Sequence, residues 1–393
     1  MAREFPRRSG AVRAPRTSWS LNDARVRAFA YQVLLVAAVG LVAWYLVSNT
    51  TQNLEKRKIA SGFGFLSREA GFEISETTFL SYSAADTYLR AIAVGLLNTF
   101  RVAAIGIVLA TVLGTLIGLA RLSRNWLLKK LAAGYVELIR NVPLLVQLFF
   151  WYTVISENLP GPREALSPLQ HIFLSNRGIV FPVPRPHPVH PWLGVALAAG
   201  VALAWPLARW ARRRQARTGK PFPVFAAGAA LVFGLPLVLY LAAGAPLELN
   251  PPVLSGFNFS GGGALSPEFA ALLLGLVIYT TAFIAEIVRA GVLAVDRGQF
   301  EAAHSLGLSR RQAMRVIVPP MTSQYLNLTK NSSLAVAIGY PDLVSIANTT
   351  MNQTGQAIEG VAIIMLVYLT ISLAISAFMN WYNRRIALRG AKA

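Results

Sequence analysis

The sequence has no cysteine and few charged side chains, and both shortages narrow the classes of protein to consider. Without cysteine among its 393 residues, the chain forms neither a disulfide bond nor a thiolate metal site. Only 14% of the residues are charged and 54% are hydrophobic, so at a mean hydropathy of +0.49 the chain is too apolar for one soluble domain. No Gly-x-x-x-x-Gly-Lys-Ser/Thr segment is present to cradle nucleotide phosphates, and no nucleophile–base or carboxylate constellation stands out. These absences argue against an enzyme.

Acidic residues are scarce relative to basic ones, with 17 Asp and Glu against 37 Lys and Arg and a net charge of +20. In a soluble protein this balance would suggest nucleic acid. In a chain this apolar it is better explained by topology, because the cytoplasmic loops of membrane proteins collect Lys and Arg. We therefore expect no nucleic-acid partner. The histidines are scattered and predict neither a metal site nor a cofactor: they are His171, His187, His190 and His304.

Eight apolar runs approach the length of about 20 residues that a membrane-spanning helix needs. Helix is the form expected of them, because in lipid every backbone N–H and C=O must be satisfied within the segment, and short alternating segments typical of strands are absent. The predicted spans are 28–47, 91–120, 135–159, 192–208, 223–243, 268–293, 318–340 and 360–382. The first run is too long for a signal peptide and lacks a cleavage site, so we expect a retained helix. The prediction is an all-α polytopic membrane protein with about eight transmembrane helices.

Basic residues orient these spans. Lys and Arg concentrate in the N-terminal tail, in the C-terminal tail and in every second loop, whereas loops 244–267 and 341–359 hold none. An even number of spans places both termini on one side, and the bias makes that side the cytoplasm. The sequence thus predicts a multi-pass protein of a lipid bilayer with both termini cytoplasmic.

The chain divides by composition into a core and additions to it. Eight prolines in 160–191 predict an extended, polyproline-like path, and the two bland spans that follow are expected to face lipid. The predicted parts are a basic tail (1–27), a first helix with a polar outer loop (28–90), a first core part (91–159), a Pro-rich insertion with two extra helices (160–266), a second core part (267–385) and a basic tail (386–393).

One polar, Arg-bearing segment, 296–320, lies between two apolar spans on the predicted cytoplasmic side. Acids near its start favour a short helix, which Gly307 can end because glycine adopts positive φ without strain. A Ser-x-x-Gln capping box beginning at Ser309 predicts a second helix, with an exit through Pro319-Pro320. Helix, glycine turn and helix make a small surface that can dock on a partner and pass rigid-body motion to the attached spans.

Five motifs lie in or beside the predicted spans. They are Gly95-Leu-Leu-Asn-Thr99, the stretch 136–148 with Pro143 and Gln147, Ala285-Glu-Ile-Val-Arg-Ala-Gly291, Glu301-Ala302-Ala303 with Gly307 and Ile317 at fixed distances, and Lys330-Asn-Ser-Ser-Leu334. Together they resemble the permease subunits of ABC importers for polar amino acids. The long first loop and two added spans are most similar to the general L-amino-acid branch of that family. One departure is Pro319, where the family more often has Leu, which predicts a local change in the helix exit.

The resemblance implies a type I ABC-importer permease core in a bacterial inner membrane that imports L-amino acids by alternating access. It implies a separate cytoplasmic ATPase, a second permease subunit that is often a related but different chain, and a periplasmic amino-acid-binding protein. It also assigns contact with the ATPase to a set of residues in the 296–320 loop: Gly298, Gln299, Glu301, Ala302, Ala303, Gly307, Leu308 and Ser309.

Charges within the spans are candidates for the translocation path or its gates, since such groups usually face a protein interior or cavity. Glu286 and Arg289 are three residues apart and can pair on one helix face, and Glu137 and Arg140 repeat that spacing. Either pair can be structural or can break and re-form during transport.

Arg101 lies about ten residues into the second span, roughly 15 Å along a helix. Its guanidinium can bind an amino-acid carboxylate in bidentate fashion, although snorkelling or pairing with an acid on another span are the alternatives. Lys330 and Asn331 are further candidates for lining the path. A Gly114-x-x-x-Gly118 pair in the second span predicts close helix packing.

Two other functions remain compatible with the sequence. An ion-coupled secondary amino-acid transporter would need no docking loop and no ATPase, and a membrane scaffold would transport nothing. Neither the amino acids carried nor the composition of the permease pair follows from the sequence.

Overall fold

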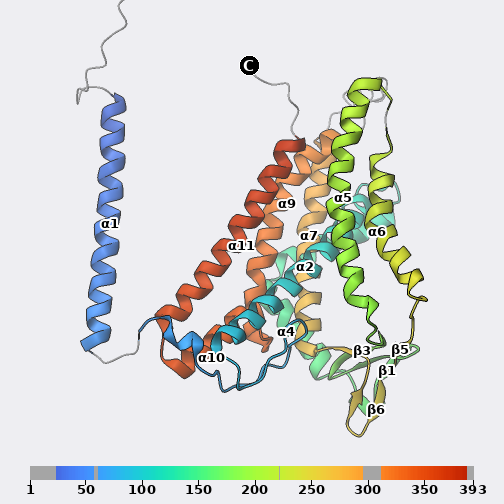
Figure 1. The fold of residues 1–393 in the computed structure, drawn as a ribbon, viewed down its shortest axis with the longest axis horizontal. Coiled ribbons are helices and arrows are strands. Elements are labelled where there is room, and N and C mark those ends of the chain that lie inside the picture. Colours follow the sequence, from blue (N-terminus) through green and yellow to red (C-terminus); the bar gives the residue numbers. More distant parts are fainter. Residues whose placement is uncertain (1–23, 57–60, 221, 295–310, 387–393) are drawn as a thin grey trace, which may run out of the picture.

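The computed structural model describes residues 24–56, 61–220, 222–294 and 311–386 as a helical bundle with a small β-structured attachment (Figure 1). The helices are α1 (Ala24–Lys56), α2 (Tyr88–Ala120), α3 (Trp126–Asn141), α4 (Leu144–Ser156), α5 (Val189–Thr218), α6 (Val224–Ala242), α7 (Pro267–Leu293), α9 (Arg311–Asn331), α10 (Leu343–Thr354) and α11 (Ala357–Ile386). Three 3-10 segments connect them, η1 (Phe63–Ser67), η2 (Pro162–Glu164) and η3 (Ser332–Ile338).

Six helices in the described part of the chain are long and apolar enough to cross a membrane, and they overlap six of the predicted spans. These are α1, α2, α5, α6, α7 and α11, and the bent pair α3 and α4 makes a seventh if it counts as one span. By the same measure α9 is too polar to be counted. The number eight and the side on which the termini lie therefore stay predictions.

The prediction of one continuous helix over 135–159 was wrong, because α3 ends at Asn141 and α4 starts at Leu144 with a bend of 104° between them. Pro143 causes the break. Proline has no N–H to donate, and its ring disfavours helical torsions in the residue before it. Val142 is accordingly extended, with φ −99° and ψ 126°.

The predicted helix exit at Pro319-Pro320 was also wrong, since α9 runs through both prolines to Asn331. Neighbouring helices can compensate the backbone groups that proline frees within a bundle. Ile317 and Met321 on either side of the pair are buried against α2 and α7, and this packing keeps the segment helical. After Asn331 the chain tightens into η3 rather than continuing as an α-helix over the predicted span 318–340.

Helix α7 is at the centre of the bundle and packs on α2, α3, α4 and α9. Its N-terminus is fixed by Ser266, whose hydroxyl accepts the backbone N–H of Phe269. Gly114 and Gly118 let α2 approach α7 closely. A Cβ at Gly118 would lie 2.7 Å from the carbonyl oxygen of Ala285, so the glycine pair has the packing role predicted for it.

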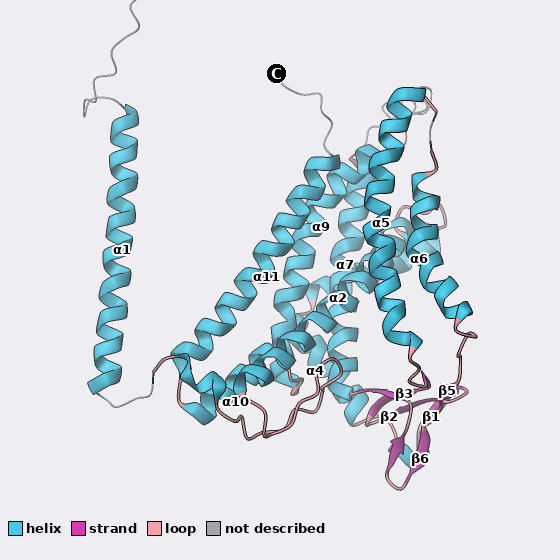
Figure 2. Cartoon of the chain, viewed as in Figure 1, coloured by secondary structure: helices cyan, strands magenta, loops and turns pink. Residues whose placement is uncertain are grey.

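The insertion contains β-strands where a polyproline-like path was predicted (Figure 2). The described chain is therefore mostly helical, with a small amount of β-structure. An antiparallel sheet has the order β1-β2-β3-β8, and the pairs β4-β5 and β6-β7 flank it. The strands are β1 (Leu166–Leu169), β2 (Ile172–Ser175), β3 (Gly178–Phe181), β4 (Val183–Pro184), β5 (Leu249–Asn250), β6 (Val253–Ser255), β7 (Asn258–Ser260) and β8 (Gly263–Leu265). Pairing satisfies backbone groups that polyproline would leave to water, and Pro168 and Pro184 occupy edge strands, where a missing N–H is tolerated.

Two parts of the chain stand outside the bundle. Helix α1 lies apart from the other helices, and none of its apolar window is buried within the chain (Figure 1). Helices α5 and α6 pack mainly on each other and likewise bury 6% and 0% of their windows. That they face lipid stays a prediction.

Candidate functional site

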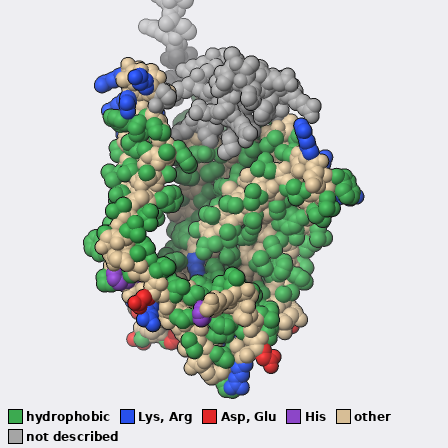
Figure 3. All heavy atoms as spheres, turned by 90° about the vertical axis from the view of Figure 1, so that its right-hand side faces the viewer, with side chains coloured by type: hydrophobic (Ala, Val, Ile, Leu, Met, Phe, Trp, Pro, Cys, Tyr) green, Lys and Arg blue, Asp and Glu red, His purple; other side chains and the backbone are tan. Residues whose placement is uncertain are grey.

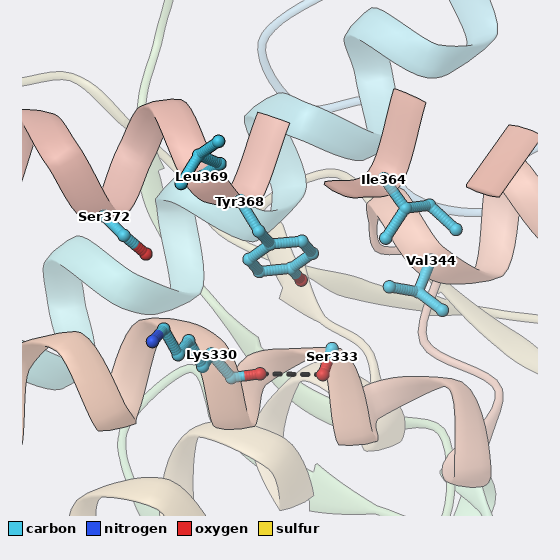
Figure 4. Close-up of a pocket in the computed structure, with 7 residues that line it drawn as sticks. All are labelled: Lys330, Ser333, Val344, Ile364, Tyr368, Leu369 and Ser372. Carbon is cyan, nitrogen blue, oxygen red and sulfur yellow. Dashed lines mark hydrogen bonds between the residues drawn. The ribbon is translucent and has the colours of Figure 1, made fainter. Parts of the chain in front are cut away.

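A cavity of about 400 Å³ lies between α9 and α11, beside the start of α10 (Figure 4). Its volume is within the range of small-molecule sites. Tyr368 and Ser372 project from α11 towards the segment that carries Lys330 and Ser333. The full lining is Lys330, Ser333, Val344, Ile364, Tyr368, Leu369 and Ser372, and we refer to it as the Lys330 pocket. It combines an apolar wall with one cation and three hydroxyl groups.

Lys330 occupies the last turn of α9, where a positive charge is favoured by the helix dipole. Among the described residues it has no carboxylate partner. Within the same part of the chain, the buried hydroxyl of Tyr368 also has no hydrogen-bond partner. A cation without a carboxylate partner beside a cavity can bind the carboxylate of a solute. Asn331, predicted together with Lys330, is half-buried and does not line the pocket.

Arg101 is not open in this way, because it pairs with Glu76 from the loop that precedes α2. Its Nη1 lies 2.8 Å from Glu76 Oε2 and 2.9 Å from Thr78 Oγ1, and the two charged side chains are 9% and 8% exposed. The guanidinium also covers the ring of Phe269 at 4.0 Å, near the N-terminal end of α7. Glu76 lies in a loop outside the predicted spans, whereas the alternative considered from the sequence was an acid on another span. Helical spacing therefore did not point to Glu76.

The Gly95–Thr99 motif holds the turn between η3 and α10 against α2. The Asn98 amide donates to the carbonyl oxygens of Glu76 and Pro341 at 2.9 Å, and the Thr99 hydroxyl accepts the N–H of Leu343 at 3.1 Å. Gly95 makes this approach possible, since a Cβ there would lie 2.9 Å from the carbonyl oxygen of Asp342. The motif therefore joins the outer loop, α2 and the wall of the Lys330 pocket.

Asp342 is the buried carboxyl in that turn. Burial raises its pKa to about 7, although the backbone N–H of Ser345 donates to Oδ1 at 2.8 Å and acts in the opposite direction. Its second oxygen, Oδ2, has no partner among the described residues. The carboxyl consequently titrates near neutral pH, where an ordinary aspartate stays ionised.

A second ionic cluster forms near the C-terminal end of α7. Glu286 accepts hydrogen bonds from Arg289, with 2.6 Å between Oε1 and Nη2, and from Arg121 at the end of α2. The predicted Glu286–Arg289 contact is thus present, and it contains a third member that the sequence did not single out. We call these three residues the Glu286 cluster. It directly precedes residues 295–310, which lie outside the described part of the chain.

The other predicted positions have different outcomes. Glu137 and Arg140 form no ion pair with each other, and within the described ranges the Arg140 guanidinium instead lies 5.2 Å from the ring of Phe283. The residues assigned to ATPase contact all fall within 295–310, so their geometry is not described: Gly298, Gln299, Glu301, Ala302, Ala303, Gly307, Leu308 and Ser309.

Six long apolar helices in the described part of the chain, with α7 at the centre of the bundle, are the architecture of a multi-pass membrane protein. The chain belongs to the family of inner membrane components of binding-protein-dependent transport systems, whose model matches residues 106–388. It is therefore an inner-membrane protein, and the membership favours the importer interpretation over a secondary transporter.

Three relatives match nearly the whole chain. YhdX of Escherichia coli (strain K12) is 52% identical over 382 residues, with 94% of this chain and 97% of that protein covered. The general L-amino acid transport system permease protein AapQ of Rhizobium johnstonii is 47% identical, with 95% and 96% covered. The glutamate/glutamine/aspartate/asparagine transport system permease protein BztB of Rhodobacter capsulatus is 40% identical, with 95% and 97% covered.

Proposed function

We propose that this chain is the permease subunit of an ATP-driven importer of L-amino acids. The observation that carries the proposal is the Lys330 pocket, where a lysine without an acid partner among the described residues lines a cavity of about 400 Å³. Every amino acid offers a carboxylate to such a cation. The names of AapQ and BztB, which refer to transport of amino acids, support the same substrate class.

In this proposal the Lys330 pocket is a substrate-binding position on the translocation path, and a charged contact lies at each end of that path. Leu328, close to Lys330, packs against Gly106 of α2, about one turn beyond Arg101. Phe269 and Glu286 are 17 positions apart on α7, or roughly 26 Å along the helix. The Glu76–Arg101 pair then closes the outer end and the Glu286 cluster the inner end. Alternating access opens one while the other stays closed.

Four partner roles complete the proposal. The chain has no phosphate-cradling loop, so ATP is hydrolysed on a separate subunit that docks on the 296–320 loop. A second permease subunit, alike or different, completes the path, and a periplasmic protein delivers the amino acid. The bilayer surrounds the spans. Asn331, Glu137 and Arg140 remain candidate path or gate residues on the strength of their positions in the sequence.

Purification of the tagged chain in mild detergent, with masses measured for all co-purifying proteins, tests the partner assignment. We expect an ATPase with the wild type and none with Glu301→Lys, because the substitution reverses a charge in the docking loop. Glu248→Lys is the matched control, since Glu248 is 77% exposed and lies in the insertion. A functional chain without an ATPase would overturn the proposal.

Uptake into proteoliposomes tests the transport step itself. Vesicles that contain the purified complex and ATP inside should accumulate labelled L-amino acids supplied with the binding protein. Accumulation should stop when ATP is replaced by a non-hydrolysable analogue and should continue when ionophores collapse ion gradients. The reverse pattern would identify an ion-coupled secondary transporter.

A further inference from the structure

The α5–α6 hairpin, residues 189–242, has a cationic end without any acidic counterpart. From 165 to 247 the sequence contains neither Asp nor Glu. The last three turns of α5 and the following residues nevertheless carry six basic side chains, all exposed: Arg209, Arg212, Arg213, Arg214, Arg217 and Lys220. No acid of the hairpin can neutralise these charges, so their counterions must come from outside it.

Aromatic rings are interleaved with these cations. The Arg209 guanidinium lies 3.6 Å from the ring centroid of Trp205, and that of Arg214 lies 5.4 Å from Trp210. Phe222, beyond the turn, meets the Trp210 ring edge-on at 5.3 Å. Tryptophan is enriched at the headgroup level of membranes, and cation–π contacts hold a guanidinium beside such rings. Guanidinium groups beside tryptophan rings are thus the combination expected at the headgroup level of a membrane.

The flanks of the hairpin fit a lipid neighbour better than a protein one. Helices α5 and α6 pack mainly on each other, with Gly200 close to the backbone of Leu231, and little of either is buried by the rest of the chain. Lys and Arg side chains gather at one end of this pair, above a mostly hydrophobic flank (Figure 3). The charged end is on the same side of the molecule as the C-terminal ends of α7 and α11 (Figure 1).

We propose that the α5–α6 hairpin binds anionic phospholipid through this arginine array. The phosphodiester of a lipid such as phosphatidylglycerol accepts bidentate hydrogen bonds from guanidinium groups, while its acyl chains lie along the apolar flank. The tendency of cytoplasmic loops to be basic explains the sign of the charge. It does not explain why five of the six residues are arginine, why two stack on tryptophan, or why no acid accompanies them.

Native mass spectrometry of the full detergent-purified complex, titrated with phosphatidylglycerol or phosphatidylcholine, measures the binding directly. The wild type should retain phosphatidylglycerol in preference to phosphatidylcholine. Each basic residue at an anionic membrane surface contributes about fivefold in affinity. Replacement of Arg212, Arg213, Arg214 and Arg217 by Gln together should therefore lower the retained phosphatidylglycerol at least tenfold. Excess inorganic phosphate should not displace it, because the acyl chains are part of the contact.

Two further variants keep the proposal falsifiable. In the first, the same four arginines are changed to lysine, which preserves the charge and hence the topology. The amount of retained phosphatidylglycerol should fall several-fold, because lysine lacks the planar fork of the guanidinium group. The control removes the basic side chains Arg124, Lys129 and Lys130 near the start of α3, and should retain lipid as the wild type does. Equal retention of both lipids by the wild type would overturn the proposal. So would equal losses in the α3 control and the arginine variant.

Discussion

Two helix pairs in this chain approach each other through glycine, yet their surroundings differ. Gly114 and Gly118 bring α2 against α7, and 61% of the apolar window of α7 is buried by other helices. Gly200 brings α5 against α6, but only 6% of the α5 window is buried. The same packing device thus builds the centre of a bundle in one case and a detached hairpin in the other.

The distribution of charge follows this difference. The α2–α7 pair carries Arg101, Glu286 and Arg289, and each has a partner of opposite charge. The apolar parts of α5 and α6 carry no charged group, and the cations of α5 appear only at its end. Charged groups are costly in a bilayer unless they are paired or face a cavity. The comparison supports our proposals that the transport path runs through the bundle and that the hairpin contacts the membrane.

The largest expected effect comes from breaking the buried ion pair of the bundle. Glu76→Gln leaves Arg101 buried and unpaired, which should lower the free energy of unfolding by about 3–5 kcal/mol. Glu248→Gln removes the acid of an exposed pair in the insertion, with Arg185 62% exposed, and should cost about 0–1 kcal/mol. Denaturant unfolding of both variants in detergent measures the difference. Similar losses would show that burial does not distinguish the two regions.

The next effect concerns Lys330, which has no acid partner in the described ranges. Lys330→Met should reduce uptake about 10–100-fold, because a hydrogen bond to a charged group contributes about 1.5–3 kcal/mol. Lys330→Arg should restore part of the rate, and the affinity of the binding protein for its amino acid should not change. Lys129→Met, on the exposed face of α3, is the control for loss of a positive charge. Normal uptake by Lys330→Met would remove the pocket from the path.

Glycine substitution tests the packing side of the comparison. In Gly118→Leu the new side chain meets Val288 and the backbone of α7 inside the bundle, and overpacking there should cost about 1–3 kcal/mol and much of the uptake. In Gly200→Leu, α6 can move outward into lipid, so most of the uptake should remain. Thermal midpoints and proteoliposome uptake for both variants decide this. Loss of uptake in Gly200→Leu would make the hairpin part of the transport machinery.

The smallest effect is a pH dependence that only the bundle side should have. Because burial raises the pKa of Asp342 to about 7, its stabilising contribution is fully present below the unfolded value of 3.8 and is lost as pH rises through 7. Stability should therefore fall by about 1 kcal/mol from pH 6 to pH 8. Asp342→Asn should flatten this slope. An unchanged slope in that variant would assign the dependence to another group.

Several features followed from local sequence alone. Apolar runs predicted six of the helices that the structure contains, since burial in lipid depends on composition over about 20 residues. The Glu286–Arg289 contact followed from helical spacing, and the close approach at Gly118 followed from glycine spacing. The motifs, including those in 295–310, indicated the family that the chain was then found to belong to.

Other features depended on neighbours that are distant in the chain. Pro143 lies at the break between α3 and α4, where the Gln147 amide donates to the carbonyl oxygens of Ile139 and Val142. Pro319 and Pro320 lie within α9, which packs against α2 and α7. Glu76, which pairs with Arg101, is 25 positions away, and Arg121, the second partner of Glu286, is 165 positions away, so neither contact follows a helical period.

Composition and periodicity by themselves determined that this chain lies in a membrane as helices, because the free energy of transfer into lipid is a sum over local side chains. Whether a given charge is paired or left open was decided only in three dimensions. Arg101 and Lys330 are both basic residues within predicted spans, yet one is covered by Glu76 and the other faces a cavity. That distinction depends on which loop folds back over which helix, and pairwise electrostatic contact has no fixed spacing along a sequence.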